Sequence, residues 1–269
     1  MGTGEAYGQS AGARGAYYLG DGLFSSDDSG KSWQPIVSTS AGNPLSFTTG
    51  WQLVWNLAVD PSAADTANEI YAAIYNQIQR SSNGGKTWVS QLAGGYFTDV
   101  AVTSKGIVYA TSSSDGAKKG IFRANNDGKL VNINPSFLGT TYKRIVIGVD
   151  PNNENVVYFL LNTDGFGRKS ANYKGDIEWN GLYRYTYIKG DGSGDSGVWE
   201  YLSMNLPNGG VFDRWNVQGS YDMLVRVRPG NSQEVYIGGT NVYRSSTGFS
   251  DSTHTEKIGG YKLKAQFPD

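Results

Sequence analysis

Short apolar and aromatic runs alternate with glycine-rich and asparagine-rich turns along most of this chain. Runs such as 53–59, 69–74 and 145–149 are rich in Val, Ile, Leu and Tyr, residues that are common in strands. The run 53–59 is largely apolar, which indicates a strand that is covered on both faces. Turn residues separate successive runs, so the strands are expected to pair as antiparallel hairpins.

Two similar eight-residue segments, 26–33 and 81–88, are typical of hairpin turns that their own side chains stabilise. In each octet an Asp or Asn can bond its own backbone, a Gly accepts positive φ, and a Trp can pack across the base of the hairpin. A weaker third copy covers residues 124–130. The residues that define the turns are Ser26, Asp28, Gly30 and Trp33 in the first octet and Ser81, Asn83, Gly85 and Trp88 in the second.

These octets resemble the Asp-box, or BNR repeat, of sialidase-like, xyloglucanase-like and sortilin-like β-propellers. The resemblance implies an all-β fold of four-stranded blades. It places each octet in the turn between the third and fourth strands, as a structural feature away from the ligand face. The chain is then expected to form one β-propeller domain over residues 1–269, with approximate blades at 1–40, 51–93, 97–135, 142–206 and 220–262.

Two architectures fit this repeat. The first unit has no innermost strand ahead of it, and residues 261–267 could supply that strand and close a ring of five blades. Alternatively, the chain is a piece of a larger propeller whose further blades lie on a missing segment or on a partner chain. We favour the second interpretation because the resembling bacterial proteins are usually longer and this chain begins and ends within a motif. An open fragment would expose sheet edges and would need such a partner.

Composition excludes several classes of function. The net charge of −1 gives no electrostatic case for binding nucleic acid. The chain has no cysteine and a single histidine, His254, so we expect no metal site, no cofactor and no Ser-His-Asp triad. No apolar run approaches the ~20 residues of a membrane span. The resemblance implies a secreted or cell-surface bacterial protein, although no signal peptide is present in this chain.

Asp115 and Asp164 are the candidate catalytic residues. The xyloglucanase-like family carries an aspartate at a similar place between the second and third strands, ahead of a Gly-Gly-x-Tyr-Arg pattern. The glycine pair is missing or displaced here. An inverting glycosidase needs two carboxyl groups ~6.5–9.5 Å apart. The alternative is that each Asp-Gly pair simply forms a hairpin turn.

A sialidase activity is not supported by the sequence. That family carries an Arg-Ile-Pro stretch, which is absent here, and three arginines that converge on the substrate. Arg123, Arg184 and Arg244 instead recur after an aromatic residue at one position of successive units. We therefore expect them to form a structural series.

The insertion 162–180 is the strongest candidate for ligand binding, because long loops on rigid scaffolds often carry function. Aromatic rings beside charged groups suit a glycan or a peptide. The alternative is a loop that folds over the rim. The candidate ligand-binding residues are Phe166, Arg168, Tyr173 and Trp179 in the insertion and Trp215 in a later connection.

Two functions remain open. The leading hypothesis is an extracellular binding or scaffolding propeller that recognises a polysaccharide or a protein and performs no catalysis. The alternative is an inverting glycoside hydrolase of the xyloglucanase type that uses paired aspartates. The first leads because no catalytic pair matches the family residue by residue.

Overall fold

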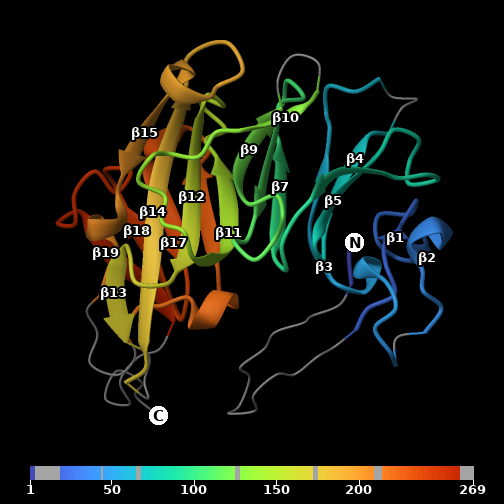
Figure 1. Cartoon of the computed structure of the whole chain (residues 1–269), viewed down its shortest axis with the longest axis horizontal. Coiled ribbons are helices and arrows are strands. Elements are labelled where there is room, and N and C mark those ends of the chain that lie inside the picture. Colours follow the sequence, from blue (N-terminus) through green and yellow to red (C-terminus); the bar gives the residue numbers. More distant parts are fainter. Residues whose placement is uncertain are drawn as a thin grey trace. The chain divides into compact units, whose positions relative to one another are not determined.

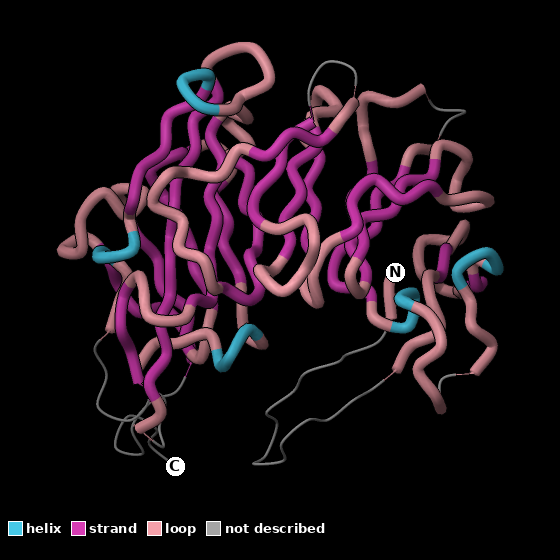
Figure 2. Tube along the Cα trace, viewed as in Figure 1, coloured by secondary structure: helices cyan, strands magenta, loops and turns pink. Residues whose placement is uncertain are grey.

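The computed structural model describes residues 1–3, 19–43, 45–64, 68–124, 128–171, 175–208 and 214–260. The chain divides into two compact units, Met1–Asn134 and Pro135–Asp269, and each is considered by itself below. Both units consist of antiparallel sheets joined by loops (Figure 1). The described helices are 3₁₀ turns of three residues, drawn in cyan in Figure 2, and none is long or apolar enough to cross a membrane.

The first unit contains two complete four-stranded sheets. In each sheet the strands follow one another in sequence order and pair only with their neighbours. The second sheet of the chain consists of β3 (Val54–Val59), β4 (Ile70–Ile74), β5 (Gln77–Ser81) and β6 (Val89–Ala93). The third consists of β7 (Thr98–Val102), β8 (Val108–Ser112), β9 (Gly120–Ala124) and β10 (Leu130–Asn132).

The first sheet of this unit is smaller. It pairs β1 (Phe24–Ser25) with β2 (Gln34–Pro35), and Gly2 forms an antiparallel bridge to Leu23 on the other side of β1. The first residues of the chain therefore occupy the place of a second strand beside β1. Two 3₁₀ turns, η2 (Val37–Thr39) and η3 (Gly50–Gln52), lead into the next sheet.

The second unit contains the two remaining sheets. The fourth sheet consists of β11 (Tyr142–Val149), β12 (Val156–Thr163), β14 (Ile177–Tyr187) and β15 (Gly197–Tyr201), and β13 (Arg168–Ala171) is added beside β14. The fifth consists of β16 (Leu224–Arg228), β17 (Asn231–Gly238), β18 (Asn241–Ser245) and β19 (Thr255–Gly260). The connections contain η4 (Gly194–Ser196), η5 (Ser203–Asn205) and η6 (Gln218–Ser220).

The described residues of the insertion 162–180 are largely strand, which differs from the expected loop. The first half of β14 pairs with β13, and its second half pairs with β15. Because β12 also runs to Thr163, the insertion lengthens the sheet as a hairpin. The alternation of apolar and polar residues from Ile177 to Asn180 suits such a strand.

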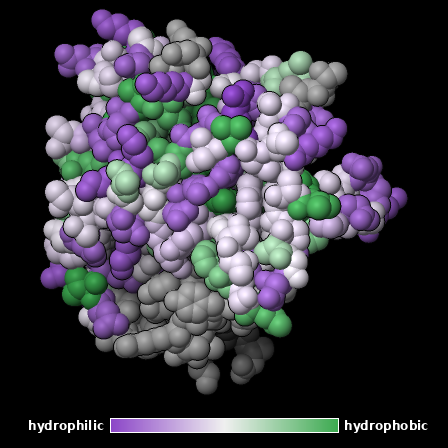
Figure 3. Space-filling model, turned by 45° about the vertical axis from the view of Figure 1, so that its right-hand side comes forward, coloured by the Kyte–Doolittle hydropathy of each residue, from purple (hydrophilic) through white to green (hydrophobic). Residues whose placement is uncertain are grey.

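Sheets within a unit pack through their apolar faces. In the second unit Leu160 and Leu182 of the fourth sheet belong to the same buried cluster as Val225 and Ile237 of the fifth. In the first unit the cluster joins residues of the second and third sheets. On the face drawn in Figure 3, hydrophobic residues form small separate patches among polar ones.

Chain direction assigns the turns to two edges of each sheet. Because consecutive strands are antiparallel, the turn between the second and third strands lies at the same edge as the connection to the next sheet. We call this the loop edge. The octets lie between the third and fourth strands, at the opposite edge, which we call the octet edge.

Candidate functional site

The first octet forms a turn that bonds to itself. Asp28 accepts hydrogen bonds from the hydroxyl of Ser26 (2.8 Å) and from the backbone N–H (2.9 Å) and hydroxyl (2.7 Å) of Ser32. The indole N–H of Trp33 donates to the carbonyl of Gly30 (3.2 Å). These bonds stabilise the carboxylate and lower the pKa of Asp28 to about 2. The role of Asp28 is therefore structural: its carboxylate holds the turn of the first octet together.

The second octet repeats the arrangement with an amide in place of the carboxylate. Asn83 accepts from the hydroxyl of Ser81 (2.9 Å) and from the backbone N–H of Thr87 (3.0 Å). The indole N–H of Trp88 donates to the carbonyl of Gly85 (3.1 Å). The turn therefore does not need a charged residue. The weaker copy at 124–130 includes residues 125–127, which lie outside the described residues.

The fifth sheet contains a turn of the same kind that the sequence does not reveal. The hydroxyl of Ser245 accepts from the backbone N–H of Thr247 (3.2 Å) and of Phe249 (2.9 Å). Ser26 and Ser81 accept from the equivalent positions of their octets. Phe249 has φ +59 and stands where the octets have glycine, so the motif is not visible in the letters.

The recurring arginines form a structural series. Arg80, Arg123, Arg184 and Arg244 each stand directly opposite a tyrosine of the neighbouring strand. The guanidinium carbon of Arg184 lies 6.0 Å from the ring centroid of Tyr158, and Arg184 forms two hydrogen bonds with Glu200 (2.7 and 2.6 Å). This pairing holds the arginines within their own sheets. It gives no converging triad of the sialidase kind.

Asp115 lies at the loop edge of the first unit, in the turn between β8 and β9. Its side chain is exposed. It accepts hydrogen bonds from the hydroxyl of Ser113 (2.5 Å) and from the backbone N–H of Tyr96 (3.2 and 3.3 Å). The carboxylate therefore fixes two neighbouring loops to each other while it remains open to solvent.

Asp164 lies at the loop edge of the second unit, directly after β12. Its side chain is exposed, and its backbone N–H donates to the carbonyl of Thr141 (3.2 Å). Asp115 and Asp164 belong to different units, so each is located within its own unit only.

The hairpin separates the predicted ligand-binding residues onto two faces. Arg168 stands opposite Asn180, and Lys169 stands opposite Trp179, so the two pairs point to opposite sides of the sheet. The ammonium group of Lys169 lies 5.9 Å from the centroid of the Trp179 ring. Arg168 and Trp179 therefore cannot contact one ligand surface on the same face.

The remaining candidates also lie apart. Phe166 is half-buried beside Gly139 of the preceding connection. Trp215 is fully buried in the core of the second unit, where its ring offers no open surface to a ligand. This corrects the expectation that Trp215 lines a binding surface: its large apolar ring is more stable in the core of the unit than in water. Tyr173 lies outside the described residues.

An aromatic cluster at the loop edge of the first unit was not predicted. We call it the aromatic platform and define it as Phe47, Trp55, Tyr75, Tyr96 and Phe97. Neighbouring rings have centroids 4.7 to 5.8 Å apart. Phe47 is 47% exposed. Tyr75 and Tyr96 are half-buried, and the indole N–H of Trp55 donates to the carbonyl of Tyr96 (3.1 Å).

Three connections build this platform. Phe47 comes from the segment before β3, Tyr75 from the turn between β4 and β5, and Tyr96 with Phe97 from the segment before β7. Asp115 joins its rim through the bond to Tyr96. The only signal in the sequence is an aromatic residue in each of these turns, and it becomes informative once strand order brings the turns to one edge.

No group of three or more His, Cys, Asp or Glu side chains is placed to hold a metal ion within the described ranges.

No protein-family model matches this chain, and no curated protein is a significant match. Solved structures do match. A GH74 enzyme from Niastella koreensis aligns with a TM-score of 0.58 at 18% identity, covering 88% of this chain and 35% of its own.

An ancestral GH74 enzyme aligns with a TM-score of 0.53 at 18% identity over 90% of this chain and 31% of its own. The α-L-arabinofuranosidase Arb93A of Fusarium graminearum aligns with a TM-score of 0.50 at 14% identity over 88% of this chain and 74% of its own. These are β-propeller glycoside hydrolases.

This chain has a propeller-like, all-β fold. It spans about a third of the GH74 enzymes that it matches. At these identities the likeness concerns the fold, and the chemistry must be argued from the residues present here.

Proposed function

We propose that this chain belongs to a polysaccharide-active β-propeller and binds a glycan on the aromatic platform. The observation that carries the proposal is the set of partly exposed rings at the loop edge, with the carboxylate of Asp115 at their rim. The three matching enzymes reported above are glycoside hydrolases of a similar fold, which supports a carbohydrate ligand.

The chemistry of the platform suits a sugar ring. The C–H face of a pyranose is apolar and can cover the face of an aromatic side chain, while its hydroxyl groups seek polar partners around the edge. Phe47 and Tyr75 pack edge to face with centroids 5.1 Å apart, which holds them in place before a ligand arrives. Preformed rings lose little entropy on binding.

Hydrolysis is the second candidate function. An inverting enzyme needs a carboxylic acid and a carboxylate on either side of the glycosidic bond. Asp115 and Asp164 are exposed carboxylates at the loop edges of their units. The glycoside hydrolase neighbours favour this function at the level of the fold. A polymeric substrate would be met outside the cell, in agreement with the secreted or surface location that the repeat implies.

Binding is tested with the purified chain and a panel of soluble polysaccharides, measured by isothermal titration calorimetry. Tyr96→Ala and Phe47→Ala should each weaken binding by about tenfold, since that corresponds to the stacking energy of one ring. Trp33→Ala is the matched control, because Trp33 is 42% exposed but lies at the octet edge. Equal losses in all three variants would refute the platform as the binding surface.

Hydrolysis is tested in the same panel by release of reducing ends. If cleavage occurs, Asp115→Asn should abolish it and leave glycan binding in place, because the amide keeps the shape but cannot take part in proton transfer. Asp27→Asn is the control, since Asp27 is an exposed aspartate of the first octet. If Asp115→Asn cleaves as fast as the unchanged chain, Asp115 is not a catalytic residue. If the unchanged chain binds a polysaccharide but releases no reducing ends, its function is glycan recognition without hydrolysis.

A further inference from the structure

The side chain of Gln52 supports the segment that carries Phe47 into the aromatic platform. The described residues of 43–49 contain no strand, and residues 43 and 45–48 form no hydrogen bond to another described backbone group through their own backbone. Gln52 lies in η3, directly after this segment, and is fully buried. Its amide nitrogen donates to the carbonyls of Asn43 and Ser46 (2.9 Å each), which precede Phe47. The side chain therefore supplies bonds that a neighbouring strand would otherwise give.

The amide oxygen of Gln52 holds the residues that follow Phe47. It accepts from the backbone N–H groups of Thr48 (2.6 Å) and Thr49 (3.2 Å), and the second bond is part of a capping box at the start of η3. A glutamine amide has two N–H donors and an oxygen with two lone pairs, so its full capacity is used by backbone groups of this segment. Four bonds from one buried side chain therefore fix the backbone on both sides of Phe47.

The turn η3 is also joined to the turn that carries Tyr75. The N–H of Tyr75 donates to the carbonyl of Leu53 (2.9 Å), the residue after Gln52. Gly50 lies so close to this turn that a Cβ at position 50 would be 2.9 Å from the carbonyl oxygen of Tyr75. The segment that Gln52 holds is therefore fixed to the same frame as Tyr75, in agreement with the edge-to-face packing of Phe47 on Tyr75.

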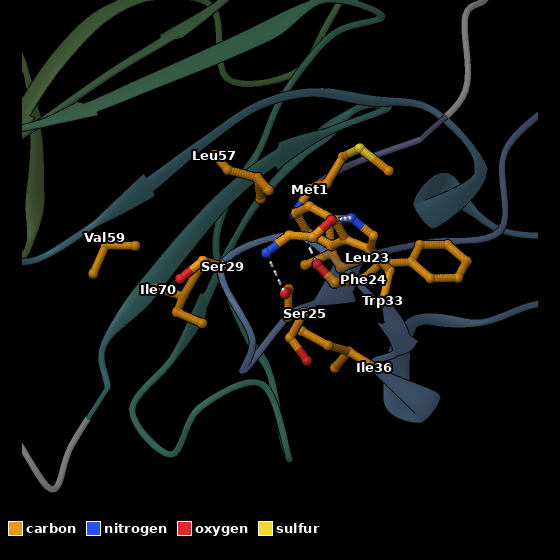
Figure 4. Close-up of a pocket in the computed structure, with 12 residues that line it drawn as sticks. Met1, Leu23, Phe24, Ser25, Ser29, Trp33, Ile36, Leu57, Val59 and Ile70 are labelled. Atoms are coloured by element: carbon orange, nitrogen blue, oxygen red, sulfur yellow. Dashed lines mark hydrogen bonds between the residues drawn. The ribbon is translucent and has the colours of Figure 1, made fainter.

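The groove of this unit that Figure 4 shows does not contain the platform. It is lined by the first octet and by strands of the first two sheets, with Leu23, Trp33 and Val59 among its residues, and by no residue of 43–49. Phe47 is 47% exposed, so burial in a cavity does not determine where its ring lies. The position of this ring depends on the backbone of its own segment and on the contact with Tyr75.

We propose that Gln52 is a positioning residue of the aromatic platform. Its four bonds fix the segment 43–49 so that the ring of Phe47 stands against Tyr75 before a glycan binds. Gln52 is fully buried and does not touch the ligand. A ring on an unsupported segment would lose conformational entropy on binding, so the glycan would bind more weakly. This inference rests on the glycan function proposed above.

Hydrogen exchange, measured by NMR on the unchanged chain, tests the bonds without any ligand. The amides of Thr48 and Thr49 should be protected about tenfold or more relative to the amide of Phe47, which has no acceptor among the described residues. Gln52→Met keeps the length of the side chain and removes all four bonds, so both threonine amides should then exchange like that of Phe47. Equal exchange of the three amides in the unchanged chain would overturn the proposal.

Calorimetry with the panel of soluble polysaccharides tests the effect on the platform. Gln52→Met should weaken binding by about tenfold, as expected for Phe47→Ala, because both variants lose the preformed ring. The double variant should bind no more weakly than Phe47→Ala alone, since Gln52 acts through Phe47. Gln79→Met is the matched control and should bind as the unchanged chain does, because Gln79 is also buried in this unit (9% exposed) but bonds to Gln77.

The remaining outcomes separate positioning from a general structural effect. Additive losses in the double variant would show that Gln52 acts on binding by another route, and this result, or an equal loss in Gln79→Met, refutes the proposal. Near-ultraviolet circular dichroism shows whether each variant is folded; if Gln52→Met is not, the exchange rates of the unchanged chain decide. If no polysaccharide of the panel binds, the proposed function fails, while the same exchange rates still decide whether Gln52 holds the segment of Phe47.

Discussion

Substitution of Phe249 tests the octet-like turn of the fifth sheet, in which Ser245 accepts from the N–H groups of Thr247 and Phe249. We call it the hidden turn because its sequence lacks the glycine of the octets. Phe249 is fully buried in the core of the second unit, yet its φ is +59, a left-handed conformation that costs a residue with a Cβ roughly 1–2 kcal/mol. Gly30 and Gly85 hold the equivalent positions of the octets with φ +86 and +85. Phe249 therefore combines a favourable side chain with an unfavourable backbone.

The two contributions can be separated by substitution. Phe249→Ala removes the ring and keeps the Cβ, so it should cost about 3–5 kcal/mol, the usual range for a buried Phe→Ala change. Phe249→Gly removes the ring but also relieves the left-handed strain. The greater flexibility of glycine in the unfolded chain offsets about 0.5–1 kcal/mol of the stability gained by relieving that strain. Glycine should therefore be more stable than alanine here by about 0.5–1 kcal/mol.

Urea denaturation followed by near-ultraviolet circular dichroism measures this difference. Phe137 is the control: it lies in the same unit, is 38% exposed and is not among the described residues with positive φ. At Phe137 the usual order should hold, with alanine more stable than glycine by about 0.5–1 kcal/mol. If alanine is the more stable substitution at both positions, Phe249 does not occupy the left-handed region and the hidden turn is wrong.

Three other predictions concern the turns and the ion pairs. The pKa of Asp28 is lowered to about 2, so its stabilising effect is present above pH 3.8 and is lost as the pH falls toward 2; Asp28→Asn should abolish this part of the acid dependence in pH-dependent melting curves. Arg184→Ala should cost about 1–3 kcal/mol in urea denaturation, because the side chain is only 20% exposed, whereas Arg244→Ala, 39% exposed, should cost about 1 kcal/mol or less. Ser245→Ala should destabilise the second unit by about 1–2 kcal/mol in the same assay, since it leaves the buried N–H of Phe249 without an acceptor, and Ser246→Ala should have little effect.

Most strand positions could be predicted from the sequence. The run 53–59 corresponds to β3 (Val54–Val59), and the run 69–74 corresponds to β4 (Ile70–Ile74). These strands are predictable because local alternation and the turns that follow determine them together. The octets were equally clear, since Ser, Asp or Asn, and Gly each supply a specific hydrogen bond or φ angle to the turn.

The insertion shows where local pattern is insufficient. Residues 162–180 have the length and composition of a functional loop, but β14 continues through them because β12 offers a partner for each residue from Trp179 to Thr186. Pairing over that length satisfies backbone groups that a loop would leave to water. The choice between loop and strand therefore depended on a neighbouring strand, which a local window does not contain.

The aromatic platform was missed for a different reason. Phe47, Tyr75 and Tyr96 come from separate connections, and each aromatic residue taken alone is a normal feature of a β-protein. The hidden turn has a related cause, since Phe249 replaces the glycine that defines the motif. In both cases the role of the residue follows from its place in the folded sheets, which depends on how several strands pair and not on the neighbouring sequence.

The hydrogen bonds and ion pairs of the carboxylates indicate which of them could act as a catalytic acid or base. Asp28 is held by three hydrogen bonds of its own turn, and Glu69, Glu200 and Glu234 are each paired with an arginine of their own sheet. A general acid or base must be able to exchange a proton with a substrate, and carboxylates held in this way are poorly suited to that task. Asp115 also accepts hydrogen bonds, from Ser113 and Tyr96, but it differs from the other carboxylates in its position beside partly exposed rings. If this chain cleaves a glycan, the reaction should therefore depend on Asp115, and a cleaving Asp115→Asn variant would direct the search to the loop edge of the second unit.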